Sequence, residues 1–314
     1  GGGGGAGGNG VDGNVGSSGP PGQGGPGGPG TDLSPSPLGA AGGQAFLSQG
    51  IYPLPGSGTV GIYDPTSSKY YIGGGGGGAN DNSSGIYPSG GLGGGGRGAT
   101  SSGNSVRGDN GISNTGGGGG GSAGAGPPGA NDRRSGGGGS GIAVVRYKIA
   151  ELAATAKATG GAISFYNGKT IHTFTTTGIF TASEPLTVEY VAIGGGGGGG
   201  AGGAGGGGGG GGAGLFLNQT GIPIDTNAFN VTIGGGGASA DMPAYPNVAT
   251  RGNSTVIAFP SGTKTATYGG GGHGNNTVGN ADPGGSGSGA GNATPGRSGG
   301  SGLGDPYPGT PGTT

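Results

Sequence analysis

The sequence predicts an irregular all-β fold in which bundles of polyglycine II helices, rods of polyproline II type, are pinned by short antiparallel β-strands. Three observations predict this class. Glycine supplies 102 of the 314 residues, apolar residues make up only 28%, and several glycine runs begin directly after a short β-type segment. Ordinary domains use roughly 45–50% apolar residues, glycine included. We therefore do not expect a conventional apolar core along the whole chain.

Composition and charge argue against several familiar classes. Collagen requires glycine at every third position, and the glycine run at 205–212 breaks that period. Charged residues make up 8% of the chain and the formal net charge is -1, which does not fit a highly charged disordered tail. Without cysteine there is no disulfide and no thiolate metal site. No apolar stretch approaches the ~20 residues of a membrane helix, so we expect no membrane insertion.

The first elements to justify are the strands that lead into glycine runs. A flexible glycine linker has no reason to carry β-branched and aromatic residues at the start of each run. We therefore interpret each pair as an anchoring strand followed by a glycine rod. The four pairs are 70–72 before 73–78, 191–193 before 194–200, 231–233 before 234–237, and 266–268 before 269–272.

The middle of the chain has the most conventional pattern. Residues 141–149 (GIAVVRYKI) predict a strand, and 150–161 predict a linker or a short helix over 150–158. A β-hairpin follows, because Asn167-Gly168 supplies the two positive-φ residues of a type I′ turn between two β-type segments. The segments 175–182 and 186–193 are expected to extend it into a small antiparallel β unit.

This order indicates two incomplete tandem repeats. Residues 1–149 form a glycine-rich repeat that has a closing strand, at 141–149, but lacks an opening hairpin. Residues 162–314 form a second repeat that opens with the hairpin unit 162–193 but lacks a closing strand. Such units need neighbours to be complete. We therefore expect adjacent repeats or subunits to complete each other. The alternative is that low complexity alone produces the alignment of glycine with glycine.

A glycine rod has no side chain to bury, so the backbone amide must order it. Fixing each residue costs ~1–2 kcal/mol, and glycine loses the most backbone freedom. In a helix of polyproline II type, three residues make a turn and every N–H and C=O points outward. Neighbouring rods can then bond to each other, at about 1 kcal/mol net for each hydrogen bond. We therefore expect pure glycine runs inside the bundle and mixed segments at its edge.

The strand-into-glycine units, the sequence NGKTIHTFTTTGIFT at 167–181 and the strand IAVVRYKI at 142–149 resemble the glycine-rich domains of bacteriophage tail proteins. Bundled rods of this type are similar to those in phage tip adhesins. The resemblance implies an extracellular fibre protein on a virion tail, whose partners are other copies of itself or other tail proteins. Two alternatives stay open: a tip adhesin that binds a host surface glycan, and a secreted bacterial fibril or matrix subunit, with or without glycans at its N-x-[ST] sequences.

Catalytic signatures based on glycine carry little information in such a chain. Two G-x-S-x-G matches, at 120–124 and 296–300, do not lie at a predicted strand-to-helix elbow. Gly168-Lys169-Thr170 has Ile163 where a phosphate loop needs its first glycine. Arg133-Arg134 is an isolated pair, far from a basic stripe for nucleic acid. We predict no enzyme, no catalytic residue, no cofactor, no metal and no nucleic acid partner.

The candidate contacts for a receptor or glycan are tyrosines beside proline. A stiff loop that presents a tyrosine ring offers apolar faces and a polar tip, which suits recognition of a sugar or protein. The alternative is that these rings cover the bundle ends in place of the side chains that the rods lack. The five candidates are Tyr52, Tyr63, Tyr87, Tyr245 and Tyr307.

Overall fold

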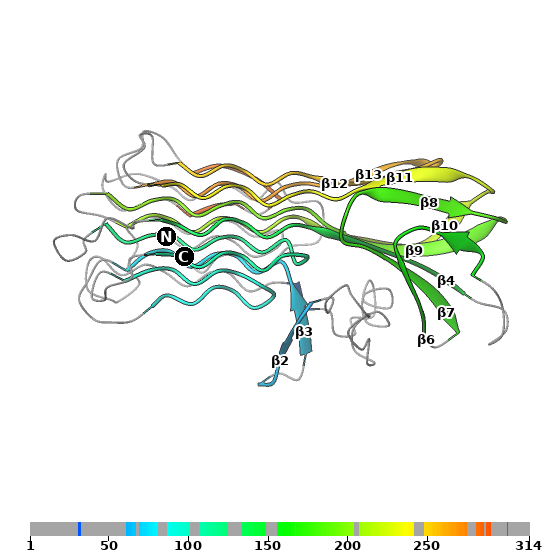
Figure 1. The fold of residues 1–314 in the computed structure, drawn as a ribbon, viewed down its shortest axis with the longest axis horizontal. Coiled ribbons are helices and arrows are strands. Elements are labelled where there is room, and N and C mark those ends of the chain that lie inside the picture. Colours follow the sequence, from blue (N-terminus) through cyan, green and yellow to red (C-terminus); the bar gives the residue numbers. More distant parts are fainter. Residues whose placement is uncertain are drawn as a thin grey trace.

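The computed structural model describes residues 31–32, 61–66, 69–80, 87–100, 107–124, 134–148, 156–166, 168–203, 207–241, 248–274, 281–285, 287–289 and 300. Within these ranges every regular element is a β-strand, and none is a helix. The molecule is elongated: a β-sandwich forms one end, and wavy extended segments run side by side from it (Figure 1). The predicted irregular all-β class with antiparallel strands is confirmed.

The sandwich consists of two five-stranded antiparallel sheets. The first has the order β10 (Phe216–Ile224), β9 (Leu186–Ile193), β4 (Ile142–Lys148), β7 (Lys169–Phe174) and β6 (Ala162–Tyr166). The second has the order β13 (Gly262–Ala266), β12 (Thr255–Phe259), β11 (Ala228–Thr232), β8 (Gly178–Ala182) and β5 (Ala158–Thr159). A third, small sheet has the order β1 (Thr31–Asp32), β3 (Lys69–Ile72) and β2 (Ile62–Asp64).

The predicted hairpin and its neighbouring strand are confirmed. Tyr166 and Lys169 are register partners across a two-residue turn, and Gly168 has a φ of 69°. β4 lies between β7 and β9 and pairs with both. Within one chain, the strand predicted at 141–149 therefore completes the sheet of the hairpin unit predicted at 162–193. The helix considered for 150–158 lies mostly outside the described residues, and its last residue, Ala158, belongs to β5.

One expected arrangement needs correction. Residues 175–182 and 186–193 do not extend the hairpin as one sheet, because β8 and β9 lie in opposite sheets. β8 pairs with β11 and β5, whereas β9 pairs with β4 and β10. The two sheets enclose a real apolar core, built on alternate strand residues such as Val145, Phe180 and Ile257, all 0% exposed. Stacked and tilted contacts link Phe180, Phe229 and Phe259 along the second sheet, and the Tyr190 ring of the first sheet packs on Phe259 across the core.

Six strands of the sandwich are continuous with extended segments of the bundle. β9, β11 and β13 each lead directly into a glycine run, as does β3 of the small sheet, which confirms the predicted strand-into-glycine units. β4, β10 and β12 each begin where an extended segment ends. The principal segments, called rods below, are 73–80, 94–100, 107–112, 115–124, 134–141, 194–203, 207–215, 234–241, 248–254, 267–274 and 281–289 without residue 286. Sandwich and bundle therefore share the same chain paths.

Two rods lie at the centre of the bundle, 115–124 and 194–203, and each is bonded through the main chain to six others. Along 194–200 the amides donate in rotation to three rods and the carbonyls accept in rotation from three more. The acceptors are in 207–215, 248–254 and 134–141, and the donors are in 115–124, 234–241 and 267–274. Glycines 194–200 are all buried. The pure glycine run 194–200 thus lies inside the bundle, as expected, whereas in the run 234–237 Gly235 is exposed and Gly236 is half-buried.

The partner of each amide repeats every three residues. Gly194, Gly197 and Gly200 donate to Leu215, Gly212 and Gly209, with N···O distances of 3.1, 2.8 and 2.8 Å. A three-residue repeat is what a helix with three residues per turn requires. The described glycines with positive φ lie at rod ends, in turns and in the bulge of β10, not along 194–200. The left-handed polyglycine II geometry itself stays a prediction that fits both observations.

Alanine marks the end of the bundle farthest from the sandwich. Ala79, Ala99 and Ala123 come from three adjacent rods and form one buried cluster. Ala201, Ala240 and Ala249 form a second cluster in the same way. Rods from both sides of residue 150 join in one bundle, since 115–124 bonds directly to 194–203. The division into two repeats stays a prediction.

Candidate functional site

The structure describes two of the five tyrosines predicted to contact a receptor or glycan. Tyr63 lies on β2 and is 50% exposed, and Tyr87 is 36% exposed beside rod 94–100. The guanidinium carbon of Arg97 lies 4.5 Å from the centre of the Tyr87 ring, which places a cation over one face of the ring. The remaining candidates, Tyr52, Tyr245 and Tyr307, lie outside the described residues. The role of all five stays a prediction.

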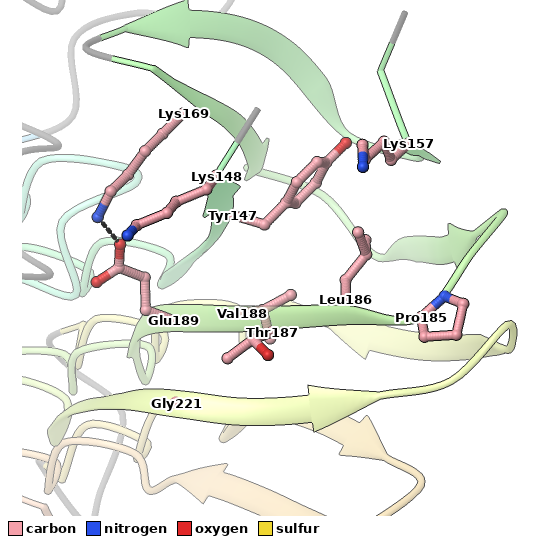
Figure 2. A pocket seen from close by; sticks show the side chains of 10 residues that line it. All are labelled: Tyr147, Lys148, Lys157, Lys169, Pro185, Leu186, Thr187, Val188, Glu189 and Gly221. Carbon is pink, nitrogen blue, oxygen red and sulfur yellow. Dashed lines mark hydrogen bonds and ion pairs between the residues drawn. The ribbon is translucent and has the colours of Figure 1, made fainter. Parts of the chain in front are cut away.

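A pocket of about 450 Å³ lies at the end of the sandwich that faces away from the rods (Figure 2). The topology creates it, because β4 ends there while its antiparallel neighbours β7 and β9 begin there. These three strand ends contribute most of the lining, and the loop before β5 and the outer strand β10 add the rest. The lining residues are Tyr147, Lys148, Lys157, Lys169, Pro185, Leu186, Thr187, Val188, Glu189 and Gly221.

Positive charge surrounds the pocket. Lys148 and Lys169 are direct cross-strand partners in the register of β4 and β7. Glu189 on β9 accepts a hydrogen bond from Lys169 and forms an ion pair with the buried Arg146, whose Nε lies 2.5 Å from the Glu189 Oε1. Lys157 pairs with Glu184 outside the lining. Among the described residues, four cationic side chains therefore surround two carboxylates, which leaves an excess of two positive charges in that set.

The wall of the pocket on the core side rests on a buried polar pair. The Tyr147 hydroxyl lies 3.3 Å from Nε2 of His172, and Nδ1 of His172 lies 2.7 Å from the Gly160 carbonyl oxygen. The Gly160 contact requires a proton on Nδ1, so Nε2 accepts from the tyrosine. Burial lowers the pKa of His172, although the Gly160 carbonyl opposes this shift. Burial also raises the pKa of Tyr147. Both groups are therefore neutral at pH 7.

A β-bulge shapes the rim of the pocket. The register between β10 and β9 shifts between Gln219 and Ile222, and Gly221 within the bulge has a φ of 72°. Side chains other than glycine rarely adopt this conformation. A Cβ at Gly221 would meet no atom within 4 Å. Backbone conformation, and not lack of space, therefore accounts for glycine at this position of the rim.

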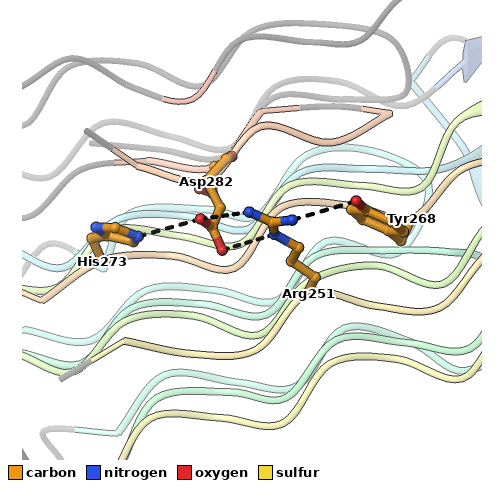
Figure 3. Close-up of polar contacts among 5 residues, drawn as sticks. Arg251, Tyr268, His273 and Asp282 are labelled. Carbon is orange, nitrogen blue, oxygen red and sulfur yellow. Dashed lines mark hydrogen bonds and ion pairs between the residues drawn. The ribbon is translucent and has the colours of Figure 1, made fainter. Parts of the chain in front are cut away.

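A second polar cluster fastens the last described rod to its neighbours (Figure 3). Arg251 forms two parallel bonds to Asp282, with Nε–Oδ2 and Nη2–Oδ1 distances of 3.1 Å each. The Arg251 Nη1 lies 3.4 Å from the Tyr268 hydroxyl, and Nε2 of His273 lies 3.8 Å from Oδ1 of Asp282. Burial alone would raise the pKa of Asp282, but His273 and Arg251 outweigh it and lower the pKa to about 2. This cluster binds three segments together.

Sequence reasoning missed the cationic pocket. Strand alternation in 142–148 does place Arg146 and Lys148 on one face, and this signal was available in the sequence. The cross-strand partners Lys169 and Glu189 depend on which strands lie beside β4, and periodicity does not specify that order. Within the described residues, no group of three or more His, Asp or Glu side chains is placed to hold a metal ion. No helix long and apolar enough to cross a membrane occurs in that part of the chain.

Residues 173–314 match the family model of a glycine-rich domain. The matched region contains the central rod 194–203, all the strands of the second sheet except β5, and the Arg251–Asp282 pair. No curated protein and no solved structure matches the chain significantly.

Proposed function

We propose that this chain is a non-enzymatic structural part of an extracellular fibre, of the kind carried by bacteriophage tails. The observation that carries the proposal is the six-neighbour packing of the central rods 115–124 and 194–203. Hydrogen bonds along the whole length of neighbouring rods resist bending, which suits a body that must transmit force and hold its ends apart. The glycine-rich match at 173–314 agrees with this role. It does not specify whether the fibre belongs to a virion or to a cell surface.

Immunogold electron microscopy tests this location. Antibodies raised against the sandwich are applied to intact cells that produce the chain and to any particles that they release. Gold on virion tails supports the tail role, and gold on cell-surface filaments supports the alternative of a secreted fibril. Labelling confined to the interior of opened cells contradicts both.

The proposed partners are further copies of the chain, and the edge strand β6 supports this part of the proposal. Its residues Ile163 and Phe165 point to one face and are 39% and 57% exposed. An edge strand with exposed apolar side chains is a ready site for pairing with another strand. We expect the wild-type chain to sediment as an assembly and Phe165→Glu to sediment as a monomer. Ile112→Glu, at a rod position that is 47% exposed, is the matched control and should sediment like wild type.

A second candidate function is attachment to a host surface, which the exposure of Tyr63 and Tyr87 favours. Replacing both with alanine should abolish attachment of the particle and leave the unfolding temperature within a few degrees of wild type. Attachment at the wild-type level by the double variant removes these two tyrosines from this function.

A further inference from the structure

We propose that the pocket at the outer end of the sandwich binds a small acidic saccharide, a sugar that carries a carboxylate or a sulfate. In this arrangement the anionic group lies between Lys148 and Lys157, and the sugar ring lies against the exposed Pro185 and Thr187 at the rim. The site goes beyond the fibre role proposed above and does not depend on it, because none of its residues belongs to a rod.

The charge around the pocket is the first argument. The chain has a formal net charge of -1, yet three of its five lysines line this one pocket. Lys148 and Lys169 stand directly opposite each other on adjacent strands, an arrangement that destabilises a sheet when both residues carry the same charge. An oxyanion in the pocket would offset this repulsion.

Lys148 is the residue best placed for that oxyanion. Figure 2 shows the Lys148 and Lys169 ammonium groups turned toward the same Glu189 carboxylate. That carboxylate is already engaged by Lys169 and by Arg146, which is 1% exposed on its side chain. Lys148 is exposed, and among the described residues the ion pairs around the pocket are those of Arg146, Lys157 and Lys169, not of Lys148. Its charge is therefore available to a ligand.

The lining beneath the lysines suits the body of a sugar. Pro185 is exposed and provides a rigid apolar edge, and the buried Leu186 and Val188 close the floor behind it. The hydroxyl of Thr187 and the backbone around Gly221 provide polar atoms at the rim. A sugar offers apolar C–H patches together with hydroxyl groups, so it matches both kinds of surface. Small-ligand sites commonly have volumes of roughly 300–1,000 Å³, and a pocket of about 450 Å³ accepts a mono- or disaccharide.

The same features disfavour a large polyanion. Nucleic acid follows a stripe of positive charge along a surface. Here the lysines converge on one pocket, and Glu184 and Glu189 stand among them. Within the ranges that the structure describes, the excess charge is enough for one anionic group and does not form a stripe.

Titration calorimetry with the full chain tests the assignment. The probes are glucuronate and glucose 6-sulfate, with glucose and inorganic sulfate as comparison ligands. We expect saturable binding of at least one acidic sugar, at least about tenfold weaker binding of glucose, and weakening with added salt because exposed charges are screened. Absence of binding by both acidic sugars overturns the proposal. Inorganic sulfate that binds as tightly as either sugar overturns the assignment of a saccharide.

Variants test whether this pocket is the site. Lys148→Gln should weaken binding of the acidic sugar about tenfold, and Lys148→Gln combined with Lys157→Gln should abolish it. Lys264→Gln is the matched control, because it removes the same charge from β13 in the opposite sheet. Lys148 is exposed, so the variant should keep the wild-type unfolding temperature, which is measured alongside. A Lys264→Gln variant that loses as much affinity as Lys148→Gln overturns the proposal.

Discussion

Gly119 donates its amide to the carbonyl oxygen of Gly197 at 2.9 Å, and this bond joins the two central rods of the bundle directly. The bond from Ser122 to Gly200 repeats it three residues later, at 3.2 Å. The two rods therefore run parallel at the distance of a main-chain hydrogen bond. At this spacing a neighbouring backbone occupies the place that a Cβ at Gly119 or Gly197 would need, so these positions exclude every residue larger than glycine.

The first prediction concerns this lack of space. A Cβ at Gly197 would lie 2.0 Å from the carbonyl oxygen of Gly270, so Gly197→Ala must push two rods apart. We expect a loss of at least about 2 kcal/mol in the free energy of unfolding, in the upper range for overpacking. Gly235→Ala is the control, since its Cβ would meet only the Asn253 side-chain nitrogen, at 3.6 Å. It should be neutral or slightly stabilising. Equal losses in denaturant titrations of the two variants would refute close packing.

The second prediction concerns acid sensitivity at Asp282. Its folded pKa of about 2 lies below the value of about 3.9 expected for an unfolded chain. The pair with Arg251 therefore stabilises the protein above about pH 4, and this contribution disappears as the pH falls toward 2. Asp282→Asn should cost about 1 kcal/mol at pH 7, a modest value because Arg251 is 45% exposed on its side chain.

Thermal unfolding between pH 2 and pH 7 measures this effect. The Asp282→Asn variant should lose less stability than wild type between pH 4 and pH 2. Asp109→Asn is the control, because the Arg97–Asp109 pair is more than half exposed on both side chains and should contribute less. Parallel pH curves for wild type and Asp282→Asn would contradict the assigned role.

The third prediction places a separate pH effect in the sandwich. Burial lowers the folded pKa of His172 below the unfolded value of about 6.5. The unfolded chain then binds more protons, so stability should fall as the pH drops below about 6.5. In His172→Gln this dependence should be weaker between pH 7 and pH 5, as followed by denaturant unfolding. His273 is present in both proteins, and its contribution therefore cancels in the comparison.

The fourth prediction concerns cooperativity between the two ends of the molecule. Phe180 is 0% exposed in the sandwich core, and Phe180→Ala should cost about 3–5 kcal/mol there. Because β9, β11 and β13 continue into rods, loss of the core should also loosen the bundle. We expect faster amide hydrogen exchange along 194–200 in the variant as well as in β8. Exchange that increases in the sandwich and stays unchanged in the rods would show two independent units.

Much of the fold could be predicted from local sequence. The segments before the glycine runs at 73, 194, 234 and 269 can be recognised as strands because their β-branched and aromatic residues contrast with the glycines that follow. The Asn167-Gly168 turn is readable because few other dipeptides favour its backbone angles. The strand at 142–148 is readable from its composition. In each case the signal lies within a few consecutive residues.

The order of the strands and the cationic pocket could not be predicted in this way. Strand alternation in 178–182 is the same whether β8 joins the first sheet or the second, and the choice depends on packing across the core. The pocket depends on Lys169 and Glu189 arriving beside Lys148 from separate strands. The hydrogen-bond partners of the rods are still harder to predict, because a run of identical glycines does not indicate which neighbouring rod accepts from each amide.

The rotation of amide partners along each rod also limits how rod lengths can change. Loss of one glycine turns all the following amides by a third of a revolution, so that each faces the wrong neighbour. Loss of three restores every pairing and shortens the rod by one full turn. Insertions and deletions within these tracts should therefore be tolerated only in multiples of three residues.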